Sequence, residues 1–264
     1  MRLHRRERTG TRIENHEGER MSVQHALLDA AKRLRNLTEE ITPKLLDECE
    51  NIDWVYNPLI YAWAPHSEYI RRHGTQGAHT MLVGMNPGHG MGNTGVPFGC
   101  PKMVREVLGI VDLPVEQPPL IHPKRPIYGL EHPKPEVSGT RIWSALSEAF
   151  GMGNATGKHV YIVNHCPLWM FNEKGTNITP DKLRGSTADT LRNVCDNHLR
   201  EVANILDSNA IIGVGRYAQR RVEAIFQDSE IEVRNVPHPS PANPFANRNG
   251  GADWREAFHS VLGI

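Results

Sequence analysis

The chain lacks any long apolar run. None of its 264 residues belongs to an uninterrupted apolar stretch near the roughly 18 residues that a membrane-spanning helix needs. Hydrophobic residues make up 39% of the sequence, which is enough for one sizeable core. We therefore expect a soluble protein with no membrane segment, and an α/β domain of this length is common.

Cysteine is scarce. The four cysteines (Cys49, Cys100, Cys166 and Cys195) lie far apart, with no C-x-x-C pair and no spacing typical of metal ligands. This pattern argues against zinc and iron–sulfur sites, and we expect neither a metal nor a cofactor. We interpret the cysteines as reduced thiols of an intracellular protein, cytoplasmic if the host is bacterial and nuclear if it is eukaryotic.

The sequence also lacks an excess of charge. Lys plus Arg and Asp plus Glu number 30 each, so the overall charge gives no basic footprint of the kind that nucleic-acid binding usually leaves. Any DNA contact would have to be local. Small basic clusters occur at Lys102 and Arg105, at Lys124 and Arg125, and at 216–221. Most clusters of this kind are simply solvent-exposed faces of helices and loops.

Apolar residues are almost missing from the first twenty positions, which mix six arginines with four glutamates. We expect residues 1–21 to form a disordered extension and residues 22–264 to form a single domain. Met21 precedes Ser22, a plausible helix cap, and is our hypothesis for the true start. The intact mass of the native protein tests this hypothesis.

Four short runs rich in β-branched residues predict strands at 79–83, 160–163, 210–214 and 231–236. Helical patterns alternate with them, and this alternation predicts a three-layer α/β/α fold with a central four-stranded parallel sheet. Residues 51–74 are expected to be loop-rich, with an aromatic face that packs. The expected helices lie at 23–50, divided or kinked at Pro43, and at 104–108, 140–150, 180–206, 216–226 and 251–262, with Thr179 as the cap of the fourth.

Each predicted strand ends in a polar or glycine-rich loop. Asn86 follows the first strand, Asn164 the second, Gly213 to Gly215 the third and His238 the fourth. The carboxyl ends of parallel strands meet at one edge of a sheet, where open α/β folds bind their ligands. The glycine-rich stretch 84–99 lacks both the G-x-x-x-x-G-K-[ST] and the G-x-G-x-x-G pattern, so a nucleotide-binding loop is a weak interpretation.

Familiar catalytic motifs are absent as well. There is no carboxylate within these loop motifs, no G-x-S-x-G elbow and no H-E-x-x-H helix. Two asparagines, a histidine and an aromatic ring suit a reaction whose leaving group departs readily. Cleavage of a pyrimidine N-glycosidic bond is such a reaction, since an amide can orient water while a histidine stabilises the departing base anion. Taken one at a time, these residues have ordinary structural interpretations: the asparagines would cap turns, the aromatic ring would belong to the core, and the histidine would lie in a loop.

The motifs, in this order, resemble those of the single-strand-selective monofunctional uracil-DNA glycosylases, a branch of the uracil-DNA glycosylase superfamily. The resemblance runs from about Trp54 to the C-terminus. The residues that carry it are YNPxxYAWxPH (56–66), GMNPG and GVPFG (84–99), HPKRPxxGLE (122–131), NHCPL (164–168), NITP (177–180), GVGR (213–216) and HPSPxNPxAN (238–247).

The resemblance implies a uracil-DNA glycosylase-like fold and specific roles. Asn86 would hold the hydrolytic water and His238 would stabilise the uracil anion. Phe98 would stack on the flipped base, Asn164 would read its edge, and Gly88 and Met91 would line the pocket near its 5-position. This pocket would accept uracil, 5-hydroxymethyluracil and related oxidised pyrimidines in single- or double-stranded DNA, and a monomeric enzyme would leave an abasic site.

The resemblance further implies that segment 239–250 enters the duplex as a wedge. Ala242 stands where arginine is common, and we hypothesise that Phe245 replaces it as the plug while Arg248 supplies charge. Where family members often have Pro-Phe after GMNPG, this chain has only His89, which is one residue shorter. This difference should alter the substrate range. The DNA-contacting residues of this segment would be Pro239, Ser240, Pro241, Ala242, Asn243, Pro244, Phe245 and Arg248.

Two alternatives remain open at the level of sequence. One is a glycosylase of the same superfamily that prefers hypoxanthine or xanthine, because an asparagine amide also pairs with purines. The other is a non-catalytic protein that binds nucleotides or abasic DNA at the same edge of the sheet.

Overall fold

A four-stranded parallel sheet forms the centre of the computed structural model, which describes residues 21–264. The strands are β2 (Thr80–Gly84), β3 (Val160–Asn164), β6 (Ala210–Val214) and β7 (Glu232–Val236), in the spatial order β3-β2-β6-β7. All four predicted strands are confirmed, and every pairing between them is parallel. The expectations for residues 1–20 lie outside the described residues.

The two edge strands of the sheet differ in burial. Every residue of β3 is buried, as is every residue of β6 inside the sheet, whereas the edge strand β7 carries Glu232 and Arg234, which form an ion pair with each other. Charged side chains on an edge strand discourage pairing with another chain. The main core therefore sits on both faces of β2, β3 and β6.

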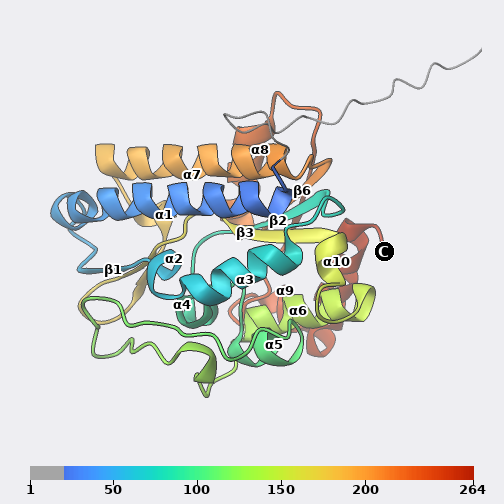
Figure 1. Ribbon diagram of the computed structural model, residues 1–264, viewed down its shortest axis with the longest axis horizontal. Helices are drawn as coiled ribbons and strands as arrows, with labels where there is room; N and C mark the ends of the chain where they lie inside the picture. The colour runs from blue at the N-terminus through green and yellow to red at the C-terminus, as the bar shows by residue number, and fades with distance from the viewer. Residues whose placement is uncertain (1–20) are drawn as a thin grey trace, which may run out of the picture.

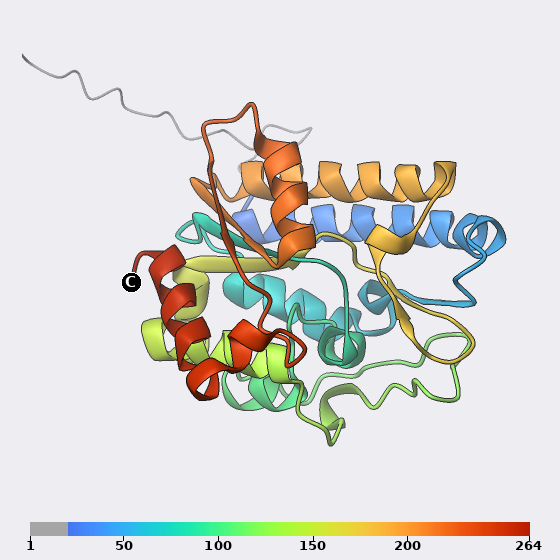
Figure 2. The ribbon, with the colours of Figure 1, turned by 180° about the vertical axis from the view of Figure 1, so that it is seen from behind.

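Helices cover both faces of the sheet, as Figures 1 and 2 show. On one face lie α1 (Val23–Glu48), α7 (Ser186–Ile205) and α8 (Arg216–Phe226). On the other lie α3 (Trp63–His73), α5 (Pro101–Glu106), α6 (Val137–Phe150) and α10 (Ala252–Leu262). The expected three-layer α/β/α architecture is confirmed. The short helices are α2 (Pro58–Tyr61), α4 (His89–Thr94) and α9 (Pro244–Asn247), with 3-10 turns at Gly129–Glu131, Thr156–Lys158, Pro180–Lys182 and Arg248–Gly251.

Two expected helix boundaries are wrong. Pro43 does not divide the first helix, because α1 continues past it to Glu48 and the fully buried Leu45 anchors the turn beyond the proline. The helix predicted from Pro180 begins only at Ser186. Residues 180–182 form a single 3-10 turn, and Gly185, with φ +97°, separates this turn from α7.

Residues 51–74 are not loop-rich, which corrects another expectation. They contain β1 (Trp54–Tyr56), α2 and α3, and β1 pairs with β4 (Trp169–Phe171) in a second, antiparallel sheet completed by β5 (Asn177–Ile178). The expected aromatic packing is confirmed, since Tyr56, Tyr61, Trp169 and Phe171 form a buried cluster beneath this sheet.

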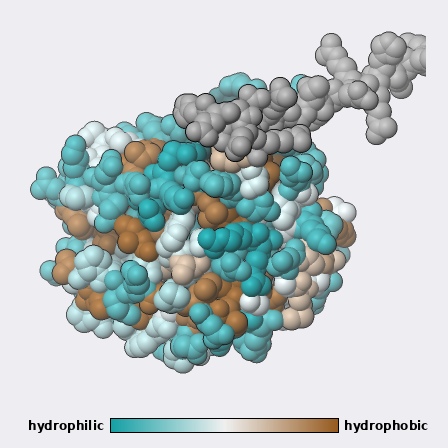
Figure 3. Space-filling model, viewed as in Figure 1, coloured by the Kyte–Doolittle hydropathy of each residue, from teal (hydrophilic) through white to brown (hydrophobic). Residues whose placement is uncertain are grey.

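Within residues 21–264, no helix is both long enough and apolar enough to cross a membrane. In Figure 3 hydrophilic residues cover much of the visible face, and hydrophobic ones are interspersed among them. All four cysteines are buried and free. The same part of the chain holds no group of three His, Cys, Asp or Glu side chains that could bind a metal ion.

Candidate active site

A pocket opens at the carboxyl edge of the parallel sheet, in the position that the strand order implied. Its volume is about 160 Å³, roughly ten times the space that one water molecule needs. Asn86, Phe98, Asn164 and His238, singled out from four separate parts of the sequence, all line it. The remaining lining residues are Met85, Pro87, Gly88, Gly90, Met91, Glu136, Ser138 and Asn177.

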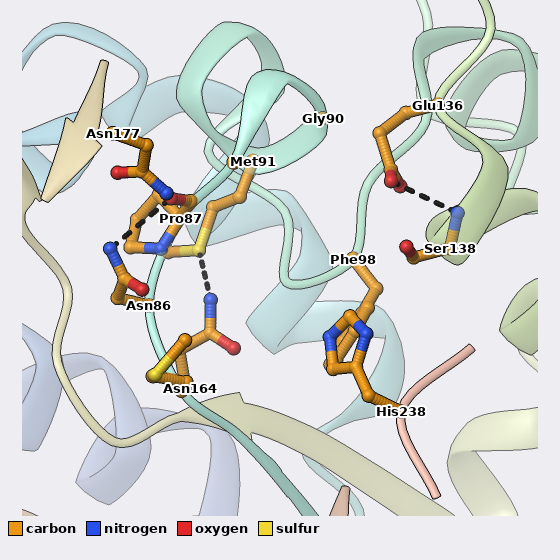
Figure 4. A pocket seen from close by; sticks show the side chains of 12 residues that line it. Asn86, Pro87, Gly90, Met91, Phe98, Glu136, Ser138, Asn164, Asn177 and His238 are labelled. Atoms are coloured by element: carbon orange, nitrogen blue, oxygen red, sulfur yellow. Dashed lines mark hydrogen bonds between the residues drawn. The ribbon is translucent and has the colours of Figure 1, made fainter. Parts of the chain in front are cut away.

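Two neighbouring strands carry the two asparagines. The backbone N–H groups of His165 and Cys166 donate to the carbonyls of Gly84 and Met85, both at 2.9 Å, so the β2–β3 pairing continues past the strand ends. This extension fixes Asn86 and Asn164 relative to each other. In Figure 4 both amides lie on one side of the pocket, opposite Phe98 and His238.

The amide groups differ in their partners. Asn164 is buried and its Nδ2 donates to Met91 Sδ at 3.1 Å. Asn86 is half-buried, and its Nδ2 reaches the carbonyls of Pro87 and Leu168 only at 3.3 and 3.4 Å. Sulfur is a weak acceptor, and hydrogen bonds of this length are weak as well. Both amides can therefore exchange these contacts for a ligand.

Gly84 makes the close approach of Asn164 and Phe98 possible. A Cβ atom at this position would lie 2.1 Å from Asn164 Oδ1 and 2.7 Å from Phe98 Cε2. Both distances are far below van der Waals contact, so any larger residue at position 84 would displace the amide, the ring or both. The first glycine of the GMNPG motif is thus a packing requirement of the pocket wall.

Phe98 occupies a strained backbone conformation. Its φ is +50°, a region that costs a non-glycine residue about 1–3 kcal/mol and that is concentrated at ligand-binding sites. Its half-buried ring lies 6.0 Å from the His238 ring, tilted by 40°. The stretch between the two glycine-rich turns, expected as a loop, forms α4, which brings Phe98 back over the end of β2.

His238 is held as a neutral hydrogen-bond donor. The backbone N–H of Ser240 donates to its Nδ1 at 3.1 Å, so the proton of the neutral ring resides on Nε2. Burial lowers the pKa of His238 below its usual 6.5. Gly215 of the third loop does not line the pocket but packs behind this residue, where a Cβ would lie 3.0 Å from that of His238.

Two polar lining residues with side chains at the pocket, Glu136 and Asn177, were not predicted from the sequence. Glu136 brings a carboxylate to the pocket, but this group caps α6 by accepting from the N–H groups of Ser138, at 2.9 Å, and Gly139. An acid just before a helical pattern is a capping signal that could have revealed it. Asn177 stands exposed at the rim and belongs to the NITP motif, to which the sequence alone assigns no role.

Segment 239–250 is braced by its own asparagines. Asn243 Nδ2 donates to the His238 carbonyl at 2.8 Å, and Asn247 Nδ2 donates to the Pro241 carbonyl at 2.7 Å. Arg141 of α6 supports the segment from outside through the Pro239 carbonyl at 2.8 Å. Pro241, Ala242 and Pro244, which follow the pocket residue His238 in the chain, are exposed.

The position of Phe245 argues against the hypothesis that it is the plug. Its ring is half-buried and packs against the main core instead of projecting from the segment. The guanidinium of Arg248, an exposed residue, lies 5.6 Å from the centre of this ring. Phe245 therefore supports the segment from beneath.

The parallel sheet and the small cavity at its carboxyl edge, lined by two asparagines, a phenylalanine and a histidine, are features of an α/β protein with a ligand-sized pocket. The family model of the uracil DNA glycosylase superfamily matches residues 72–261, and the chain belongs to that superfamily. The expected resemblance is thereby confirmed.

Within the superfamily, the chain is similar to curated relatives named single-strand selective monofunctional uracil DNA glycosylase. It is 38% identical to the Bos taurus protein, over 85% of each chain. It is also 38% identical to the Mus musculus protein, over 80% of this chain and 77% of that relative. The crystal structure of wild-type Pedobacter heparinus SMUG2 shares the fold, with a TM-score of 0.56 and 16% identity, over 87% of this chain and 95% of that one.

Proposed function

We propose that the protein is a monofunctional DNA repair glycosylase that hydrolyses the N-glycosidic bond of uracil in DNA and leaves an abasic site. The observation that carries this proposal is the meeting of Asn86, Phe98, Asn164 and His238 in one pocket. The named relatives support the same activity. A base inside the duplex cannot reach such a pocket, so the nucleotide must be flipped out.

The reaction divides between two sides of the pocket. The C1′–N1 bond breaks with its electron pair passing to the base, which leaves an oxocarbenium-like sugar and a uracil anion. The Nε2–H of His238 stabilises the anion through a hydrogen bond. The Asn86 amide orients a water molecule that adds to C1′ and loses a proton to solvent, because an amide cannot accept it.

Asn164 and Phe98 account for the choice of base. An asparagine amide offers one acceptor and one donor, which complement the N3–H and O4 of uracil. The Phe98 ring supplies a stacking surface. We propose that Met91, held against Asn164 by its sulfur, lines the pocket near the 5-position, with Gly88 at the rim, and that 5-hydroxymethyluracil also fits.

Segment 239–250 would approach the DNA beside the flipped nucleotide. Its prolines and bracing asparagines make it stiff, which a segment that separates stacked bases requires. We propose that Pro241, Ala242 and Pro244 form its leading edge, with Ser240 and Asn243 behind them. Arg248 would supply charge for a phosphate.

A panel of oligonucleotides tests this proposal. Uracil, 5-hydroxymethyluracil, hypoxanthine and xanthine are each placed in single- and double-stranded DNA, and base release is measured. We expect release of uracil and 5-hydroxymethyluracil, with strand breakage only after alkali or heat. Release of the purines alone would favour the hypoxanthine or xanthine alternative, and binding without any release would favour the non-catalytic binder.

The rate of base release should persist in mildly acidic buffer. His238 acts as a neutral donor whose Nδ1 is engaged by Ser240, and its folded pKa lies below 6.5. The neutral form therefore remains dominant as the pH falls through 6.5 and is lost only below that value. Single-turnover rates between pH 5 and 8 check this prediction, and a decline centred at 6.5 or above would contradict it.

Gly84→Ala should reduce base release by about 100-fold, the effect of displacing a reacting group by about 1 Å. The physical reason is the overlap of the new methyl group with Asn164 and Phe98. Single-turnover rates measure the loss, and thermal unfolding shows whether the fold persists. An unchanged rate in Gly84→Ala would refute the packing argument.

A further inference from the structure

The HPKRPxxGLE motif has no place in the chemistry described above, yet it lies beside the pocket. His122 anchors its first turn. The buried ring accepts from the N–H of Lys124 at 3.0 Å and contacts the Glu173 carbonyl through Nε2 at 3.1 Å. The turn is thereby attached to the hairpin between β4 and β5, and its two basic residues are held in fixed positions.

Arg125 connects this turn to the pocket rim. Its Nε donates to the Gly175 carbonyl at 2.8 Å, and its Nη1 lies 2.7 Å from His89 Nε2. His89 is exposed and directly follows Gly88, an exposed lining residue. Gly175 stands two residues before Asn177, which lines the same rim.

Three aromatic or imidazole rings continue the surface away from the rim. The rings of His89 and His132 lie 6.1 Å apart, and those of His132 and Tyr128 lie 5.6 Å apart. Tyr128 is 55% exposed, although its backbone N–H is fixed by Asn93 Oδ1 of α4 at 2.8 Å. Figures 1 and 2 show this connection running next to α4. We call His89, Arg125, Tyr128 and His132 the aromatic ledge.

The charge around the ledge suits a polyanion. Residues 123–135 contain three basic residues (Lys124, Arg125 and Lys134) and one acid (Glu131), and the carboxylate of Glu136, which follows, is engaged as the cap of α6. Although His89 is exposed as a residue, partial desolvation of its ring lowers its pKa, as do the positive charges of Arg125, His132 and Lys134. A basic surface with interleaved rings is the arrangement by which proteins hold single-stranded nucleic acid, with bases stacked on rings and phosphates against cations.

We propose that the aromatic ledge binds the unpaired nucleotides that adjoin the flipped base in single-stranded DNA, with one base stacked on Tyr128 and a phosphate next to Arg125. This inference rests on the proposed glycosylase function. The aromatic ledge would favour single-stranded DNA, because bases that remain paired in a duplex cannot stack on Tyr128.

Tyr128→Ala and Tyr128→Phe test the proposal. Fluorescence anisotropy with a uracil-free single-stranded oligonucleotide measures binding alone, and base release from uracil in single and double strands measures its effect on catalysis. We expect Tyr128→Ala to weaken single-strand binding about tenfold. It should raise KM on single strands by a similar factor, with unchanged kcat and unchanged release from duplexes. Tyr128→Phe, which keeps the ring, should behave as the wild type.

Leu120→Ala is the matched control, because Leu120 is an exposed apolar residue of the same connection, 72% accessible and outside the ledge. Wild-type binding by Tyr128→Ala, equal losses in the Ala and Phe variants, or equal losses on single strands and duplexes would each overturn the proposal. If the wild type releases no base, the proposed function fails, whereas the anisotropy measurement still tests the ledge independently.

Discussion

His238→Ala should lower the rate of base release by about 100- to 10,000-fold while leaving DNA binding nearly intact. The variant removes the Nε2–H donor that faces the pocket, and a single preorganised donor to a developing anion has an effect of this size. Because negative charge accumulates on the base only as the bond breaks, the loss belongs to the transition state. It should therefore appear in kcat and scarcely in KM.

Single-turnover kinetics on a uracil oligonucleotide measure this loss, and circular dichroism verifies the fold. His25→Ala is the matched control, since His25 is an exposed histidine on α1. His238→Gln retains a side-chain N–H and should recover part of the rate if hydrogen bonding to the anion is the cause. A rate within tenfold of wild type for His238→Ala would refute the assignment.

Asn86→Ala should produce a loss of similar size, about 100- to 10,000-fold, for a different reason. The amide positions the attacking water, and loss of positioning raises the entropic part of the barrier. Its two backbone contacts are long, so the side chain contributes little to stability, and the variant should unfold at nearly the wild-type temperature.

Asn197→Ala is the control, because it removes the same side-chain amide from a solvent-exposed position on α7 that does not line the pocket. Product affinity separates the two catalytic assignments. Free uracil should bind Asn86→Ala as tightly as the wild type, because the water site is distinct from the base site. Near-normal turnover by Asn86→Ala would show that another group orients the water.

The sequence predicted the sheet and the pocket because both depend on short-range signals combined with one topological rule. Four runs of buried, β-branched residues identified the strands, and parallel pairing then brought Asn86, Asn164 and His238 to one edge. Phe98 followed from the resemblance, since nothing in its local pattern announced a positive φ.

The errors arose where distant parts of the chain decide local structure. Strands β1, β4 and β5 have two or three residues each and exist through pairing with one another, which no window of sequence contains. The start of α7 depends on the backbone of Gly185. Glu136 carries a local capping signal, but that signal does not place it at the pocket, and the course of the segment that brings Asn177 to the rim could not be inferred.

The hydrogen bond from Ser240 to His238 links two tasks that enzymes of this kind could have kept separate. The N–H of Ser240, the second residue of segment 239–250, decides which imidazole nitrogen bears the proton. If this segment contacts DNA as proposed, a displacement of Ser240 would remove the contact that keeps the proton on Nε2. The fit of the DNA against the segment would then bear directly on the hydrogen-bond donor of the pocket.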